Sequence, residues 1–159
     1  MFFRKNKSQE LQRWHVYVIV VILIFAFGYK LYQDVWPKAM VQIGGQELRV
    51  LVANNPLRRY TGWSNRKSMG NYAGMLFVFP ERDQHTMVMR QMRFPLDIVW
   101  IDGMTIVDIA QNLQPDLAQS EAQLIPYSAR LSSTLVLELP AGFTQKYGVK
   151  VGDIVKVVQ

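Results

Sequence analysis

Hydrophobic residues gather in three stretches of this chain, one near the N-terminus and two near the centre. The central stretches are residues 74–80 and 94–103, and each is bounded by Gly or Pro. Both are too short for a helix of ordinary length. We therefore predict that both form buried strands.

Turn residues divide the remainder of the chain into further short strands. Hairpins are predicted where the pairs Gly44-Gly45 and Asp102-Gly103 interrupt alternating segments, at residues 41–52 and 96–110. Further strands are predicted at residues 85–92, 134–139 and 149–158, the last as a hairpin or bent strand. Residues 111–130 lack long apolar periodicity, so we expect a surface excursion of the kind that often carries binding functions.

Helical signals are few. Asn55 can cap a helix whose first residue is Pro56, with Leu57 and Tyr60 facing inward. A single helical turn is also expected at residues 143–147. The predicted fold is mainly β with one or two short helices, arranged as a compact barrel-like domain, because closing a sheet removes its exposed edges.

The N-terminal stretch has the features of a membrane anchor. Residues 14–29 contain no Asp, Glu, Lys or Arg, and aromatic residues flank them at both ends. With further apolar residues up to position 36, the stretch reaches the length of a spanning helix. The alternatives are a cleaved signal peptide, although no small-residue cleavage site is present, and a buried core helix, although no polar face is present.

Basic residues precede this stretch, so the positive-inside rule places the N-terminus in the cytoplasm and the bulk of the chain outside the cell membrane. The predicted segments are a cytoplasmic N-terminus (1–13), a transmembrane anchor (14–36), a spacer with the first strand (37–45) and an extracytoplasmic β-rich domain (46–159). The expected partners are the lipid bilayer, through residues 14–36, and another membrane or envelope protein.

Charge and cysteine content exclude several functions. The net charge is +6, but residues 1–38 contribute six Lys or Arg against two acidic residues, and residues 39–159 contribute twelve against ten. A nearly balanced domain outside the cytoplasm is not expected to bind nucleic acid. The chain has no cysteine, which excludes disulfides and thiolate chemistry, and we predict neither a metal site nor a cofactor.

A series of landmarks occurs over about residues 46–158, at residues 62–63, 74–80, 85–89, 95–103, 112, 137–142 and 148–153. In this order the landmarks resemble the family called domain of unknown function 192, which comprises small prokaryotic domains. The resemblance implies a small β-rich domain that is often exported or membrane-anchored, and it implies no particular activity.

Asp97 is the sharpest candidate for a functional group, because it lies between Leu96 and Ile98 in an apolar run. A buried carboxylate needs partners, and Arg90 is the natural one in the sequence. Asp97 is therefore either a perturbed carboxylate in a cleft or a structural group held by an ion pair or by backbone N–H groups. His85 is the only histidine in the predicted outer domain, and with no cysteine present it cannot form a usual zinc site.

Basic residues are concentrated in the first half of the predicted outer domain. Residues 58–93 carry seven Lys or Arg against two acidic residues, a local excess of five positive charges. Such an excess can steer an acidic partner or contact anionic lipid headgroups, and it can also be a solvated face. The candidate binding residues are Arg58, Arg59, Trp63, Met89, Arg90 and Asp97.

These features favour a membrane-anchored extracytoplasmic domain that acts as a binding or accessory module for an envelope partner. One alternative is a hydrolase or transferase acting on envelope carbohydrate or peptide, with Asp97 as the acid or base. A further alternative is a structural domain that contacts lipid. In the enzyme hypothesis His85 or Arg90 assists Asp97. It gains support if Asp97 and His85 share an open pocket, and it fails if Asp97 is buried and fully paired.

Overall fold

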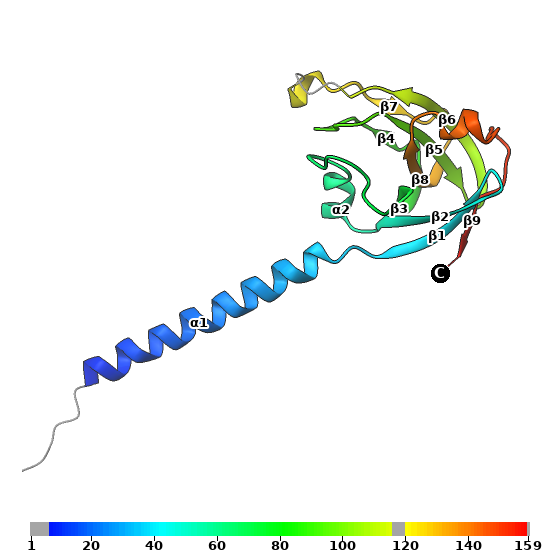
Figure 1. Cartoon of the computed structure of the whole chain (residues 1–159). Helices are drawn as coiled ribbons and strands as arrows, with labels where there is room; N and C mark the ends of the chain where they lie inside the picture. Colours follow the sequence, from blue (N-terminus) through cyan, green and yellow to red (C-terminus); the bar gives the residue numbers. More distant parts are fainter. Residues whose placement is uncertain (1–6, 116–119, 159) are drawn as a thin grey trace, which may run out of the picture. The chain divides into compact units, whose positions relative to one another are not determined.

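The computed structural model describes residues 7–115 and 120–158, with the side chains of residues 7–13 and 30–34 left out (Figure 1). The chain forms two compact units, residues 1–36 and residues 37–159. Each unit is described by itself below.

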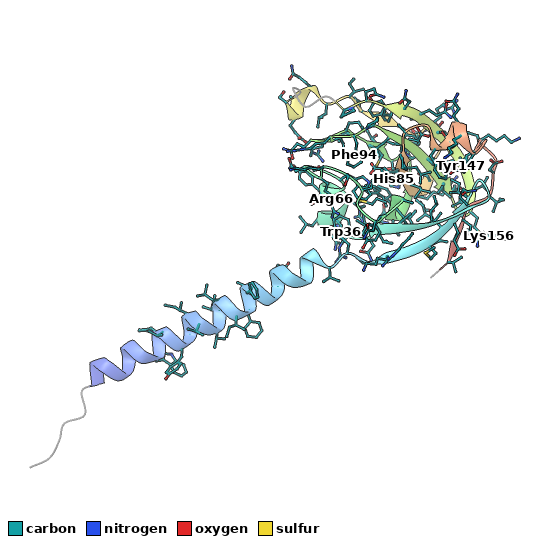
Figure 2. All side chains as sticks on the ribbon, in the orientation of Figure 1. Trp36, Arg66, His85, Phe94, Tyr147 and Lys156 are labelled. Atoms are coloured by element: carbon teal, nitrogen blue, oxygen red, sulfur yellow. The ribbon has the colours of Figure 1, made fainter. Side chains whose placement is uncertain are left out.

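The first unit contains helix α1, Lys7–Asp34. The side chains drawn on this helix project outward on all sides (Figure 2), and those from Trp14 to Tyr29 are largely exposed. Within the described part of the chain, no helix has both the length and the apolar character needed to cross a membrane. The first six residues of the predicted cytoplasmic segment lie outside the described part of the chain.

The second unit is built on a curled, mainly antiparallel sheet of seven strands (Figure 1). In spatial order these strands are β6 (Thr105–Leu113), β5 (Leu96–Asp102), β8 (Ser133–Pro140), β3 (Gly74–Asp83), β2 (Gln46–Ala53), β1 (Lys38–Ile43) and β9 (Lys156–Val158). The remaining elements are a small second sheet of β4 (Thr86–Met87) and β7 (Tyr127–Ser128), helices α2 (Pro56–Thr61) and α3 (Phe143–Lys146), and the 3-10 turn η1 (Glu121–Gln123).

Both predicted turn pairs connect antiparallel strands. Gly44 and Gly45 have positive φ angles of 55° and 71° between β1 and β2, a conformation that glycine adopts without steric penalty. Gly103, with a φ of 62°, follows β5 at the second hairpin. The prediction of a mainly β domain with few helices is therefore confirmed.

The interior of the sheet is filled by aliphatic side chains from its central strands. Val50, Leu76, Val99 and Leu137 come from β2, β3, β5 and β8, and each is at most 2% exposed. Burying one such side chain contributes roughly 1.5–3 kcal/mol to stability. This apolar cluster covers one face of the sheet.

Hydrogen bonds across the open side of the sheet make the domain a partly closed barrel. The segment that leads into β9 at one edge meets the start of β6 at the other edge. The backbone N–H of Ile106 donates to the carbonyl of Asp153 over 2.9 Å, and that of Val155 donates to Met104 over 2.8 Å. The predicted final hairpin at 149–158 is instead a series of turns followed by β9.

The central pair β2 and β3 is parallel, and the residues between these strands therefore have to cross over from one end of the sheet to the other. This crossover, residues 54–73, contains α2. Leu57 and Tyr60, predicted to face inward, are 52% and 61% exposed, so that prediction is wrong. The short helix contains no buried residue and is held by its ends instead.

The prediction of a strand at residues 85–92 is also wrong over most of that range. Only Thr86 and Met87 pair, with β7, and the chain then turns. Met87, Met89 and Met92 are each at most 8% exposed, but Met87 is buried from β4, whereas Met89 and Met92 are buried from the turn that follows. The predicted excursion at 111–130 includes the end of β6, η1 and β7.

Candidate functional site

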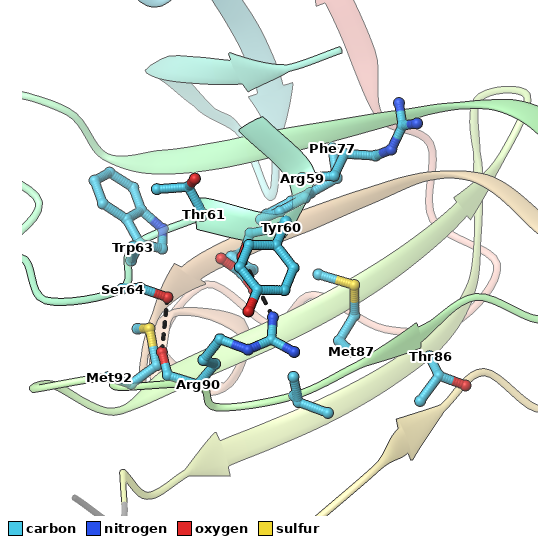
Figure 3. Close-up of a pocket in the computed structure, with 13 residues that line it drawn as sticks. Arg59, Tyr60, Thr61, Trp63, Ser64, Phe77, Thr86, Met87, Arg90 and Met92 are labelled. Carbon is cyan, nitrogen blue, oxygen red and sulfur yellow. Dashed lines mark hydrogen bonds between the residues drawn. The ribbon is translucent and has the colours of Figure 1, made fainter. Parts of the chain in front are cut away.

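A cavity lies against the face of the sheet that is turned away from the apolar cluster. Leu137 and Leu139 of β8 belong to that cluster, so Glu138 between them faces the other way. The cavity has a volume of about 240 Å³ and lies between β3, β8, the crossover and the segment after β4 (Figure 3). Its lining residues are Arg59, Tyr60, Thr61, Gly62, Trp63, Ser64, Phe77, Thr86, Met87, Val88, Arg90, Met92 and Glu138.

Helix α2 forms one wall. The side chain of Asn55 caps it by accepting a hydrogen bond from the N–H of Arg58 over 2.8 Å, and Pro56 is its first residue, so the predicted cap is confirmed. The helix places Arg59 and Tyr60 at the cavity. Arg59 also donates to the carbonyl of Val78 in β3 over 2.9 Å, which ties the helix to the sheet.

The turn after β4 forms the opposite wall. The hydroxyl of Ser64 donates to the carbonyl of Arg90 over 2.9 Å, and this bond joins the crossover to the turn (Figure 3). The guanidinium carbon of Arg90 lies 4.2 Å from the centre of the Tyr60 ring, and Nη1 donates to the Tyr60 carbonyl over 3.3 Å. Met87 and Met92 give this wall its apolar surface.

Arg90 also forms an ion pair with Glu121 of η1. Its Nε donates to Oε1 of Glu121 over 2.7 Å. This hydrogen bond raises the pKa of Arg90 and lowers the pKa of Glu121. One of the two guanidinium groups at the cavity is therefore partly neutralised by an acidic residue outside the lining.

Glu138 and Trp63 supply two polar groups without partners. Glu138 is 4% exposed and Trp63 is 1% exposed. Neither Oε2 of Glu138 nor Nε1 of Trp63 has a hydrogen-bond partner among the described residues. Burial raises the pKa of Glu138 to about 8, so its side chain is mainly an uncharged carboxylic acid at neutral pH.

The cavity therefore offers hydrogen bonds within apolar walls. An uncharged Glu138 can donate through its O–H and accept through its other oxygen, and the indole N–H of Trp63 can donate. The lining contains one carboxyl group and no histidine. Among residues 7–115 and 120–158, no group of three or more His, Cys, Asp or Glu side chains is arranged to hold a metal ion.

Comparison with protein-family models identifies the family of this domain. Residues 39–157 match the model of domain of unknown function 192 (DUF192), described as "Uncharacterized ACR". The chain belongs to this family. A comparison with curated proteins finds no match.

Two solved structures resemble this DUF192 domain. A protein from Sinorhizobium meliloti, described as a candidate transcription regulator, is 32% identical, with a TM-score of 0.68 over 77% of this chain and 95% of that one. A protein of unknown function from Novosphingobium aromaticivorans is 27% identical, with a TM-score of 0.64 over 76% of this chain and 83% of that one.

The DUF192 domain brings three of the predicted binding residues together. Arg59, Trp63 and Arg90 line the same cavity. Arg58 lies outside the lining, where its Nη1 donates to the side-chain oxygen of Asn54 over 3.0 Å. Met89 is 5% exposed and packs in the interior beside the cavity rather than in its wall.

Asp97 lies apart from the cavity and has a structural environment. Oδ1 accepts the N–H groups of Asn112 (2.8 Å) and Gly142 (3.0 Å), and Oδ2 accepts the N–H (2.8 Å) and hydroxyl (2.6 Å) of Thr144. The carboxylate is fully buried. The expected pairing with Arg90 is wrong, because four neutral donors hold Asp97 and Arg90 pairs with Glu121.

His85 also lies outside the cavity lining. Its ring stacks on Phe79 with the ring centres 3.6 Å apart, and its Nε2 lies 3.1 Å from the carbonyl of Glu81. Asp97 and His85 therefore do not share this pocket, and Asp97 is buried with both oxygens paired, so both observations count against the enzyme hypothesis.

Sequence reasoning missed Glu138. A signal was present, since an acidic residue between Leu137 and Leu139 repeats the pattern that drew attention to Asp97. Both side chains are buried in the sheet. They differ in their partners, and those partners come from distant parts of the chain.

Proposed function

We propose that this protein is a membrane-anchored extracytoplasmic binding module, and that the cavity beside Glu138 is its ligand site. The observation that carries the proposal is the pair of buried polar groups without partners, Glu138 Oε2 and Trp63 Nε1, on the wall of one cavity. The apolar stretch at residues 14–29 and the basic residues before it support the anchor.

Unpaired buried polar groups are costly. Each lost hydrogen bond to a buried group costs roughly 1–3 kcal/mol, and most buried polar atoms in proteins have partners. Two such atoms in one cavity are explained if a bound molecule supplies the missing partners. A ligand would then recover this free energy, in addition to the apolar contacts with Phe77, Met87 and Met92.

The lining favours binding over catalysis. Glu138 has no second acid or base beside it in the lining, and the Ser64 hydroxyl is committed to the carbonyl of Arg90. Asp97, the acid or base of the enzyme hypothesis, is buried with both oxygens hydrogen-bonded. The proposed role is therefore to hold a ligand, or the end of a partner, at the membrane surface.

Photo-crosslinking in cells tests this function in the full-length protein. A benzophenone amino acid in place of Tyr60 sits at the cavity and is exposed, and the same probe in place of Leu131 is exposed but outside the lining. We expect a discrete adduct, detected by intact-mass spectrometry, from position 60 and not from position 131.

A second substitution makes the test specific for the cavity. Glu138→Leu removes the unpaired carboxyl group, and we expect it to abolish the adduct from position 60. Circular dichroism and a thermal melt establish that the double variant folds. No adduct from position 60, or equal adducts from both positions, contradicts the proposal.

A further inference from the structure

The arrangement of donors in the cavity identifies the chemistry of its ligand, on the premise that the proposed binding function is correct. Trp63 offers an N–H that can only donate. Figure 3 shows the edge of its ring that carries the nitrogen turned toward the other lining residues. Glu138, when protonated, offers an O–H to the same cavity. To accept from both donors, a ligand needs either one oxygen with two lone pairs or two oxygens.

The charges around the cavity are positive. Arg59 and Arg90 line it, and among the described residues Arg90 forms an ion pair with Glu121. The segment from 58 to 93 has an excess of five positive charges. A cationic ligand would therefore be repelled at the entrance, and an anionic ligand would be attracted.

The size and walls of the cavity limit the ligand further. Its volume of about 240 Å³ is that of a small organic group, equivalent to about eight water molecules at roughly 30 Å³ each. Tyr60, Phe77, Met87 and Met92 give it aromatic and thioether surfaces. Methionine adapts to irregular apolar shapes, so these walls fit a short apolar stem.

We infer that the cavity binds a carboxylate on a short apolar stem, whose oxygens accept hydrogen bonds from the indole N–H of Trp63 and the protonated carboxyl group of Glu138. The stem packs against Phe77, Met87 and Met92. Arg90 and, at longer range, Arg59 stabilise the negative charge.

This arrangement makes binding depend on pH in a defined direction. The ionisable groups that face or flank the cavity are Arg59 and Tyr60 from α2, Arg90 from the turn, Glu121 from η1 and Glu138 from β8. Deprotonation of Glu138 removes a donor and places a second negative charge beside the ligand. With a pKa of about 8 for Glu138, affinity is expected to be roughly thirtyfold weaker at pH 9.5 than at pH 6.5.

Three matched probes test the ligand class in the full-length protein in detergent micelles. They are 3-phenylpropionate, its amide and 3-phenylpropylamine, which differ only in the head group. Binding is measured by isothermal titration calorimetry at pH 6.5 and pH 9.5. We expect the carboxylate to bind at least tenfold more tightly than the amide at pH 6.5, and the amine not to bind.

Variants connect the pH effect to the proposed donors. Glu138→Gln keeps an N–H donor at every pH, so its affinity for the carboxylate should change less than threefold between the two pH values. Trp63→Phe removes the N–H and keeps a ring, and should weaken binding about tenfold. Trp100→Phe is the matched control, because the indole N–H of Trp100 donates to the His85 carbonyl outside the cavity.

The same carboxylate can come from a free acid or from the C-terminal residue of a peptide. N-acetyl-glycyl-phenylalanine and its C-terminal amide separate these sources. Tighter binding of the peptide acid than of 3-phenylpropionate identifies a peptide end, and tighter or equal binding of 3-phenylpropionate identifies a free acid. In either case the peptide amide should bind at least tenfold more weakly than the peptide acid.

Opposite results overturn the inference. Binding of the amine that strengthens at pH 9.5 would show a cation site on an ionised Glu138. No binding by either acid, with the Glu138-dependent adduct at position 60 retained, would refute the carboxylate and leave the binding function standing. Loss of both the acid binding and the adduct would refute both proposals.

Discussion

Glu138 and Asp97 are two carboxyl groups buried in one sheet, yet their surroundings give them opposite properties. Asp97 accepts four hydrogen bonds from Asn112, Gly142 and Thr144. Glu138 has an unpartnered Oε2 and a pKa raised to about 8 by burial. Donors, rather than burial alone, therefore decide whether a carboxyl group in this sheet is a structural group or a candidate for ligand binding.

The raised pKa of Glu138 should make stability depend on pH. The folded state holds the proton up to about pH 8, whereas the unfolded chain releases it near 4.5. The stabilising contribution of Glu138 is therefore fully present below the pKa of the unfolded chain. It is lost as the pH rises through the pKa of the folded state. We expect urea denaturation, followed by tryptophan fluorescence, to give a free energy of unfolding about 3 kcal/mol lower at pH 8 than at pH 5.

Glu138→Gln is the control for this effect, because glutamine does not titrate. The variant should lose most of the decrease between pH 5 and pH 8. Asp108 and Glu121 have lowered pKa values, so their contributions change at more acidic pH, below this window. An equally steep decrease in the variant would assign the pH dependence to another group.

Asp97→Asn should destabilise the domain without changing the cavity. Asparagine keeps one oxygen as an acceptor. Its amide N–H₂ replaces the other oxygen and faces donors whose hydrogen bonds that oxygen accepts in Asp97. We expect a loss of about 2–4 kcal/mol in the free energy of unfolding. The adduct from a probe at position 60 should persist at conditions where the variant is folded, and its loss there would restore a functional role for Asp97.

Asp102→Asn is the matched substitution at the end of the same strand. Its carboxylate pairs with Arg82 at the surface, where the Arg82 side chain is 60% exposed. Exposed ion pairs contribute well under 1 kcal/mol in most proteins. A similar loss for both variants would show that the hydrogen bonds of Asp97 contribute no more to stability than the surface ion pair of Asp102.

At the level of the elements, strand positions could largely be predicted from the sequence, but the surroundings of the cavity could not. Residues 74–80 and 94–103 signal buried strands by composition and by their Gly and Pro boundaries. Residues 85–92 alternate like a strand, yet the strand ends at Met87, and Met89 and Met92 are buried from the turn that follows. The alternation is a local property of the sequence, whereas the backbone conformation here depends on packing against distant residues.

The parallel pairing of β2 with β3 had no local signal either. It requires a crossover, and this crossover brings Trp63 to the cavity that Glu138 also lines. These two residues are far apart in the chain, so a single sequence could not show that they share a cavity. An acidic residue inside a run of leucines was a signal, but it did not distinguish a paired group from an unpaired one.

Gly74 fixes the packing of β3 against β8. A Cβ added to Gly74 would lie 2.4 Å from the carbonyl oxygen of Glu138 and 3.1 Å from Cδ2 of Leu139. The strands would have to separate, because a backbone oxygen cannot rotate away. We expect Gly74→Ala to lower the free energy of unfolding by about 3 kcal/mol, measured by urea denaturation.

The same substitution should disturb the cavity, since β3 and β8 supply Phe77 and Glu138. Gly28→Ala is the control, because its added methyl meets no atom within 4 Å. It should leave the unfolding of the β domain unchanged. Stability of Gly74→Ala equal to that of the unmodified protein would mean that the two strands are less closely packed than described.

At the level of the whole molecule, the proposed arrangement places residues on opposite sides of a membrane. The chain contains no cysteine, so a single introduced thiol reports its own location. We expect Ser120→Cys, at an exposed position of the β domain, to react with a membrane-impermeant maleimide in intact cells. Ser8→Cys should react only after the membrane is permeabilised, because basic residues flank that position and favour the cytoplasmic side.

Labelling of both positions, followed by gel-shift detection on the membrane fraction, separates the alternatives for the N-terminal stretch. A cleaved signal peptide would remove position 8 and release the labelled domain from the membrane fraction. The reverse pattern, with position 8 labelled and position 120 protected, would place the β domain in the cytoplasm. The cavity would then meet cytoplasmic ligands, and the proposal of an envelope binding module would be wrong.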